Sequence, residues 1–149
     1  MRRVVLMLSV AAFFAGCGGE KPEATDVEYF AVPGQTGLPF SEAVRVGPML
    51  YLAGQIGGDS SGKVVAGGIE PETRQTIENI KAILERHGSS LDRVVKCTAM
   101  LADMQEWATI NGVYVKYFTK NLPARSAFGS TGLARGAKIE LECWATVAR

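Results

Sequence analysis

The sequence predicts an α+β protein with one β-sheet and two helices on one of its faces. Residues 70–87 and 103–118 carry apolar side chains at helical spacing, whereas residues 138–148 alternate between polar and apolar as a half-buried strand does. Strand-like segments precede, separate and follow the two helical segments, and this order is typical of one sheet with helices on one face. The other face has no helix to cover it, so we expect further subunits there.

A hairpin precedes the first helical segment. Residues 44–46 and 49–53 have the apolar and aromatic composition of strands, and Gly47 and Pro48 between them favour a turn. Gly54 follows the second strand. A glycine there lets a ligand or another part of the chain approach closely, and the alternative interpretation is an ordinary glycine at a strand end.

The first helix is predicted over residues 70–87. Pro71 suits its first turn, and Gly88 follows its basic end. Its core-facing stripe is expected to consist of Thr73, Ile77, Ile80, Ile83 and Leu84. We expect His87, the single histidine, to be a surface residue at the helix end, so a catalytic arrangement based on histidine is hard to build.

A strand over residues 93–102 leads to the second helix, 103–118. Asp103 can cap this helix, and Glu106 three residues later completes the pattern of a capping box. The buried stripe of the helix is expected to consist of Trp107, Ile110, Tyr114 and Phe118.

Two charged residues belong to the last predicted strand-like runs: one opens the run that continues as the strand 126–130, and the other lies within the strand 138–148. Arg125 follows the turn stiffened by Pro123, and Glu140 lies in the second strand. A guanidinium binds a planar carboxylate through two parallel hydrogen bonds, and a carboxylate can transfer protons. We therefore expect neighbouring strands to bring Arg125 and Glu140 into one site. The alternative is a salt bridge or two solvated charges.

Five segments in collinear order resemble the Rid family of enamine/imine deaminases, of the RidA/YjgF type. The segments are residues 53–56, 73–84, 107–111, 123–126 and 138–140. The resemblance implies a chorismate-mutase-like fold, with one mixed sheet and two helices on one face. It also implies a homotrimer with sites in the clefts between subunits.

The resemblance further implies hydrolysis of a 2-imino acid, formed from its enamine tautomer, to a 2-keto acid and ammonia. Arg125 would bind the substrate carboxylate and Glu140 would activate water, with no cofactor. The other expected pocket residues are Phe40, Ala53, Gly54, Asn111 and Ala127. Tyr, Ser and Cys are usual in the family where this chain has Phe40, Ala53 and Ala127, so a drier pocket is expected. The alternative function is a non-catalytic trimeric protein that binds a small carboxylate through Arg125.

The first 17 residues have the pattern of a bacterial lipoprotein signal peptide. Arg2 and Arg3 are positive, residues 4–14 form an uncharged, mostly apolar run, and small residues precede Cys17. The run is shorter than the roughly 20 residues that span a bilayer. We therefore predict lipidation of Cys17 and a protein anchored to the membrane by lipid alone, facing the periplasm. The alternative is a buried N-terminal helix.

Residues 18–26 lack large apolar side chains and predict a flexible tether, so the folded domain is expected over residues 27–149. The chain has a formal net charge of +1 and no cluster of basic residues, so no nucleic-acid partner is expected. No CxxC or HExxH spacing indicates a metal site. Cys97 and Cys143 both point to the expected core, where free thiols and a disulfide are both possible.

Overall fold

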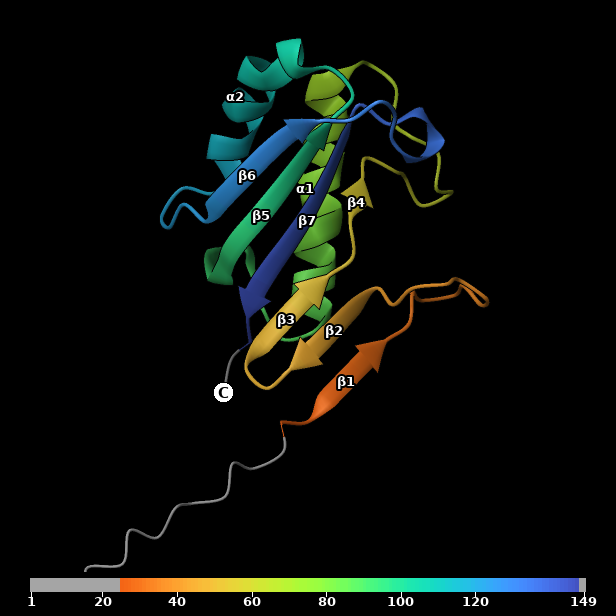
Figure 1. Ribbon diagram of the computed structural model, residues 1–149, viewed down its shortest axis with the longest axis vertical. Helices are drawn as coiled ribbons and strands as arrows, with labels where there is room; N and C mark the ends of the chain where they lie inside the picture. The colour runs from red at the N-terminus through yellow and green to blue at the C-terminus, as the bar shows by residue number, and fades with distance from the viewer. Residues whose placement is uncertain (1–24, 148–149) are drawn as a thin grey trace, which may run out of the picture.

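The computed structural model describes residues 25–147 of the chain. They form a seven-stranded sheet with both α-helices on one face (Figure 1), so the predicted α+β architecture is confirmed. The strands are β1 (Val27–Phe30), β2 (Ala43–Val46), β3 (Met49–Leu52), β4 (Gln55–Ile56), β5 (Val94–Leu101), β6 (Ala124–Gly129) and β7 (Ile139–Thr146). The α-helices are α1 (Ile69–Arg86) and α2 (Trp107–Tyr117), and single 3-10 turns are η1 (Leu91–Arg93), η2 (Met104–Glu106) and η3 (Ala134–Gly136).

The predicted signal peptide, residues 1–17 with Cys17, lies outside the described residues, as does most of the predicted tether, 18–26. The first strand begins at Val27. Between residues 25 and 147, neither helix is long and apolar enough to cross a membrane.

The strand order along the sheet is β1-β2-β3-β7-β5-β6, and the short β4 also pairs with β7. The predicted hairpin forms between β2 and β3, and Gly47 at its turn has a φ of 55° that favours glycine. β5 and β6 are parallel and therefore need a crossover, which α2 provides. The last strand in the sequence, β7, consequently lies between β3 and β5 and not beside β6.

The hydrophobic core lies between the helices and the sheet. All five residues of the predicted α1 stripe are buried. Ile110 and Tyr114 in α2 and Phe118 directly after it are buried as predicted, Val113 is buried as well, and Trp107 is half-buried. Full burial of a large aliphatic side chain stabilises the fold by about 1.5–3 kcal/mol, so these stripes hold both helices on the sheet.

The start of α2 differs from the predicted capping box. The Asp103 carboxylate accepts a hydrogen bond from the Gln105 backbone N–H at 2.8 Å, as a cap does. Glu106, however, accepts a hydrogen bond from Nζ of Lys138 at 2.8 Å, and this bond raises the pKa of Lys138. The ammonium group of the distant Lys138 thus takes the place of the local backbone N–H as the partner of the Glu106 carboxylate.

Cys97 in β5 and Cys143 in β7 form a disulfide, with Cα atoms 4.2 Å apart. The two residues are directly opposite in the antiparallel register, and both are fully buried. Strand alternation predicts that both side chains point into the core, but it does not predict which strands pair. The sequence alone therefore could not distinguish a disulfide from two free thiols. The disulfide links strands from two distant parts of the chain, 46 residues apart.

We expect reduction of the Cys97–Cys143 disulfide to lower the free energy of unfolding by about 4 kcal/mol, the loop-entropy value for this separation. Urea unfolding of residues 27–149 with and without dithiothreitol measures the change. The double variant Cys97→Ala/Cys143→Ala is the control, because its midpoint should not respond to the reductant. Equal midpoints for oxidised and fully reduced wild type would contradict the prediction.

Candidate active site

A cleft of about 560 Å³ lies beside β4, and four residues predicted for the site line it. They are Phe40, Ala53, Gly54 and Glu140. The other walls come from the loop between β1 and β2, the loop after β4, helix α1 and the turn η3. The strand ends and loops around β4 thus bring together residues that are up to 100 positions apart in the sequence, from Phe40 to Glu140.

The carboxylate of Glu140 packs over Gly54. Glu140 lies opposite Ile56 in the pairing of β7 with β4, and its side chain is half-buried. A Cβ atom at position 54 would lie 2.9 Å from Cδ and 3.2 Å from Cγ of Glu140, so a side chain there would displace the carboxylate. The close approach suggested by Gly54 is therefore made by Glu140. None of the ion pairs within residues 25–147 involves this carboxylate, which is free to act on a molecule in the cleft.

Arg125 lies in the edge strand β6 and points toward α2. Its guanidinium contacts the rings of Trp107 and Tyr114, with Cζ 4.6 Å and 4.5 Å from the two ring centroids. Its Nη2 donates to Oδ1 of Asn111 at 2.5 Å. Trp107 is half-buried and packs against the core as well as against this cation. Two aromatic rings and an amide therefore hold the guanidinium in place.

The surroundings of Arg125 leave one of its donors unused. Among the described residues, Nη1 of Arg125 is buried and has no hydrogen-bond partner. Burial raises the pKa of Tyr114 to about 12, although the nearby Arg125 cation acts in the opposite direction. The Tyr114 phenol is thus neutral at physiological pH and supplies no negative charge. A buried cationic donor without a partner indicates a place for an anionic ligand.

Arg125 and Glu140 do not meet within one chain, and the expectation that neighbouring strands carry them is wrong. β5 separates β6 from β7, with Arg125 paired to Cys97 and Glu140 paired to Met100. Paired residues share a face of the sheet, and Cys97 faces the helices whereas Met100, three residues along, faces away. The two charged side chains therefore leave opposite faces. Asn111 and Ala127 lie with Arg125, and Phe40, Ala53 and Gly54 lie with Glu140.

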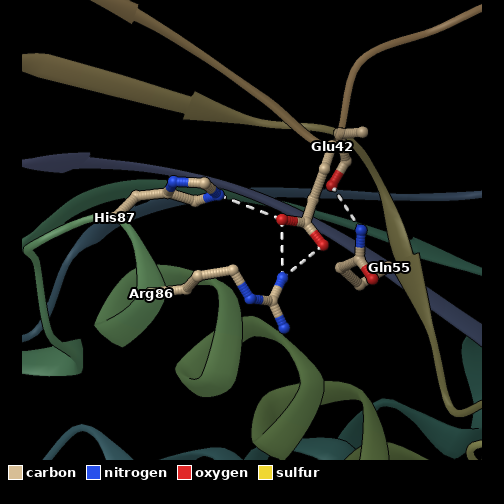
Figure 2. A network of polar contacts seen from close by, with 5 residues as sticks. Glu42, Gln55, Arg86 and His87 are labelled. Atoms are coloured by element: carbon tan, nitrogen blue, oxygen red, sulfur yellow. Dashed lines mark hydrogen bonds and ion pairs between the residues drawn. The ribbon is translucent and has the colours of Figure 1, made fainter. Parts of the chain in front are cut away.

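An ionic cluster around the buried Glu42 supports the wall of the cleft (Figure 2). Both oxygens of Glu42 accept hydrogen bonds of 2.6 Å from Nη1 of Arg86, and Oε2 lies 3.0 Å from Nε2 of His87. The Glu42 backbone carbonyl accepts from the Ala53 N–H at 2.9 Å. The end of α1 is thereby tied to the segment that carries Gly54.

This cluster corrects the prediction for His87. The imidazole is not a surface group, since its side chain is only 11% exposed and its ring stacks on Phe30 with centroids 4.2 Å apart. Glu42 is buried and needs cationic or hydrogen-bonding partners, which the end of α1 supplies. The sequence analysis did not identify Glu42 as a structural residue. The one feature that could have indicated it is the position of a carboxylate directly before an apolar strand.

The two halves of the arrangement have complementary chemistry. Arg125 offers a positioned cation for a carboxylate, and Glu140 offers a carboxylate at a cleft large enough for a small molecule. Between residues 25 and 147, no group of three His, Cys, Asp or Glu side chains could hold a metal ion.

The chain is similar to known proteins in both sequence and structure. The family model described as Endoribonuclease L-PSP matches residues 33–147. The human 2-iminobutanoate/2-iminopropanoate deaminase is 43% identical over 111 residues, which cover 74% of this chain and 80% of the human protein.

Solved structures match as well. RidA from an Antarctic Psychrobacter has a TM-score of 0.71 at 31% identity and covers 84% of this chain and 99% of its own. The YjgF gene product of E. coli has a TM-score of 0.70 at 33% identity, covering 79% and 92%. These likenesses confirm the predicted chorismate-mutase-like fold. Since the family model matches most of the chain, this protein belongs to the Endoribonuclease L-PSP family, the RidA/YjgF family that its motifs resemble.

Proposed function

We propose that the protein hydrolyses 2-imino acids to 2-keto acids and ammonia, in a site that two subunits build together. The observation that carries this proposal is the guanidinium of Arg125, held by two rings with Nη1 left without a partner. A ligand carboxylate would supply the missing acceptor. The names of the human and mouse relatives, 2-iminobutanoate/2-iminopropanoate deaminase, favour hydrolysis over binding alone.

The reaction follows from the two charges. Arg125 of one subunit binds the substrate carboxylate and orients the imine carbon toward the cleft of its neighbour. Glu140 of that neighbour accepts a proton from water while the water oxygen bonds to the imine carbon. The carboxyl group returns this proton to nitrogen, which gives a carbinolamine with one hydroxyl group and one NH2 group. Glu140 then moves the hydroxyl proton to the NH2 group while the C–N bond breaks and the C=O bond forms, so that a 2-keto acid and ammonia result. The imine carbon is electrophilic by itself, so the step requires no cofactor.

Two subunits are needed because one chain holds the charges on opposite faces of its sheet. Phe128 and Trp144 are 50% and 38% exposed, and their pairing with Met100 and Lys96 places them on the face that carries Glu140. Large apolar side chains gathered on a sheet face favour its burial by another subunit. This supports the homotrimer that the family resemblance implies, with the Arg125 edge of one subunit against the cleft of the next.

We expect substitutions of Arg125 and Glu140 to have different effects on ligand binding and on turnover. Arg125→Ala removes the carboxylate anchor and should cost about 3–5 kcal/mol in both 2-oxobutanoate binding and kcat/KM. Glu140→Gln keeps the shape and should still bind 2-oxobutanoate, while kcat falls about 10²–10⁴-fold. Calorimetry and keto-acid release from freshly generated 2-iminobutanoate measure these effects. Equal binding and turnover in wild type and Arg125→Ala would refute the role of Arg125, and wild-type binding without turnover would favour the binding-protein alternative.

Mixed oligomers provide the control for a shared site. Arg125→Ala and Glu140→Gln subunits, denatured and refolded together, should regain about a quarter of wild-type activity, since random assembly of a ring pairs an intact Arg125 with an intact Glu140 at that frequency. Sedimentation should give three times the monomer mass. A site contained in one chain would regain nothing on mixing.

Gly54→Ala should lower kcat/KM about 10²-fold, because the new Cβ displaces the Glu140 carboxylate and small misplacements of a catalytic group have effects of this size. The Glu140 side chain can rotate away, so the free energy of unfolding should change by less than about 1 kcal/mol. Gly132→Ala is the matched control, since a Cβ there meets no atom within 4 Å. Full activity in Gly54→Ala would show that the carboxylate position is unimportant.

We also propose that the protein is exported and anchored by lipid at Cys17, facing the periplasm. The pattern of residues 1–17 supports this location. The buried disulfide between Cys97 and Cys143 gives independent support, because disulfides persist in oxidising compartments such as the periplasm and are rare in the cytosol.

Cys17→Ser should abolish palmitate labelling and release the protein from the membrane fraction, because it removes the sulfur that carries the lipid. Metabolic labelling of bacteria that express the full chain measures this. Cys97→Ala retains Cys17 and should stay labelled. An unlabelled wild-type chain that retains its first 16 residues by mass spectrometry would rule out the anchor.

A further inference from the structure

An arginine other than Arg125 lines the cleft that holds Glu140. Arg135 lies in the turn η3, between β6 and β7, and has φ 57° and ψ 22°. Within residues 25–147 it is the one residue other than glycine with a positive φ. An L-residue seldom adopts this left-handed conformation, and such residues cluster at functional sites. The backbone of Arg135 thus has a conformation that is intrinsically unfavourable for an L-residue, and this conformation places its side chain at the cleft.

The Arg135 guanidinium is fixed against the opposite loop. Its Nη1 donates to the backbone carbonyl of Gly62, which lies 73 residues earlier in the sequence. A Cβ at position 62 would lie 3.4 Å from Cζ of Arg135, so the glycine leaves room for the guanidinium. A guanidinium has five N–H donors, and the contact with Gly62 uses a donor of Nη1 only.

Arg135 has no anionic partner in the part of the chain that the structure describes, where none of the ion pairs includes it. It is also the one Lys or Arg among the described residues that line the cleft. Two of the three acidic residues that line the cleft are engaged elsewhere, and the third is Glu140. Glu42 is bound by Arg86, and Oδ1 of Asp59 accepts hydrogen bonds from Ser61 and Lys63 in its own turn. The Ser61 hydroxyl is the main cause that lowers the pKa of Asp59 and keeps it ionised.

We propose that Arg135 binds a second anionic group of the substrate, distal to the carboxylate that Arg125 binds, so that the enzyme acts on imines of acidic amino acids. This inference rests on the proposed deaminase function. Arg135 belongs to the same chain as Glu140, and Arg125 comes from the neighbouring subunit. A 2-iminodicarboxylate would therefore lie between two guanidinium groups, with its imine carbon facing Glu140. Arg135 is then a specificity-determining residue and takes no part in the chemical step.

The test compares two substrates of similar length and different charge. The 2-imino acids formed in situ from glutamate and from methionine by amino-acid oxidases are offered to the full chain, wild type and Arg135→Gln. The variant should lose about tenfold in kcat/KM for the glutamate-derived imine, mainly through KM, because a hydrogen bond to a charged group contributes binding of this size. The methionine-derived imine should react within about twofold of wild type. Arg135→Lys should recover part of the loss, because it restores the charge without the fork.

Two controls make the result decisive. Arg74→Gln removes the same charge from an exposed residue on α1 that does not line the cleft, and it should leave both substrates unaffected. Calorimetry with 2-oxoglutarate and 2-oxohexanoate measures the same discrimination without turnover. Equal losses for both substrates in Arg135→Gln would overturn the inference and reduce Arg135 to a clamp on Gly62. Failure of wild type to hydrolyse any imine would refute the proposed function alone, and an Arg135-dependent preference for 2-oxoglutarate would still support the anion site.

Discussion

The pairing of β7 with both β3 and β5 is the constraint on which the rest of the structure depends. β7 is last in the sequence and central in the sheet (Figure 1). Ile139 and Leu141 on one face are completely buried under the helices, whereas Glu140 between them faces the cleft. One strand therefore supplies the middle of the core and the acidic group of the site. The Cys97–Cys143 bond joins β7 covalently to β5 at the same place.

With β7 in the centre, β6 is left at the edge of the sheet. Arg125 on this edge cannot reach the face of Glu140, and α2 packs against it with Trp107, Asn111 and Tyr114. Aromatic rings and an amide hold a guanidinium without neutralising it, as a carboxylate would. The crossover that makes β5 and β6 parallel thus leaves the Arg125 guanidinium against uncharged side chains of α2.

Local periodicity was enough to predict both helices, five of the seven strands and the face on which most of their residues lie, but it did not predict β1 or the two-residue β4. The alternation of Ile139, Glu140 and Leu141 gave the correct direction of each side chain, because neighbouring residues in a strand point to opposite faces. Local periodicity could not predict contacts between residues that are far apart in the sequence. The strand order places Arg125 and Glu140 two strands apart. The contact with the buried Glu42 orients the His87 side chain. The motifs named the residues of the candidate site, and only the fold shows that one chain holds two separate halves.

The separation of the halves has a chemical consequence. Had Arg125 and Glu140 met within one chain, the guanidinium and the carboxylate would have formed a salt bridge, and each would have lost the property that the proposed reaction needs. On opposite faces, the cation keeps an unused donor and the carboxylate keeps its lone pairs. In the proposed assembly, the two charges would come near each other only across a cleft that a substrate can fill. A substrate that brings its carboxylate to Arg125 and its electrophilic carbon to Glu140 would then take the place of the salt bridge, and the binding energy of the two charges would act on the reacting molecule.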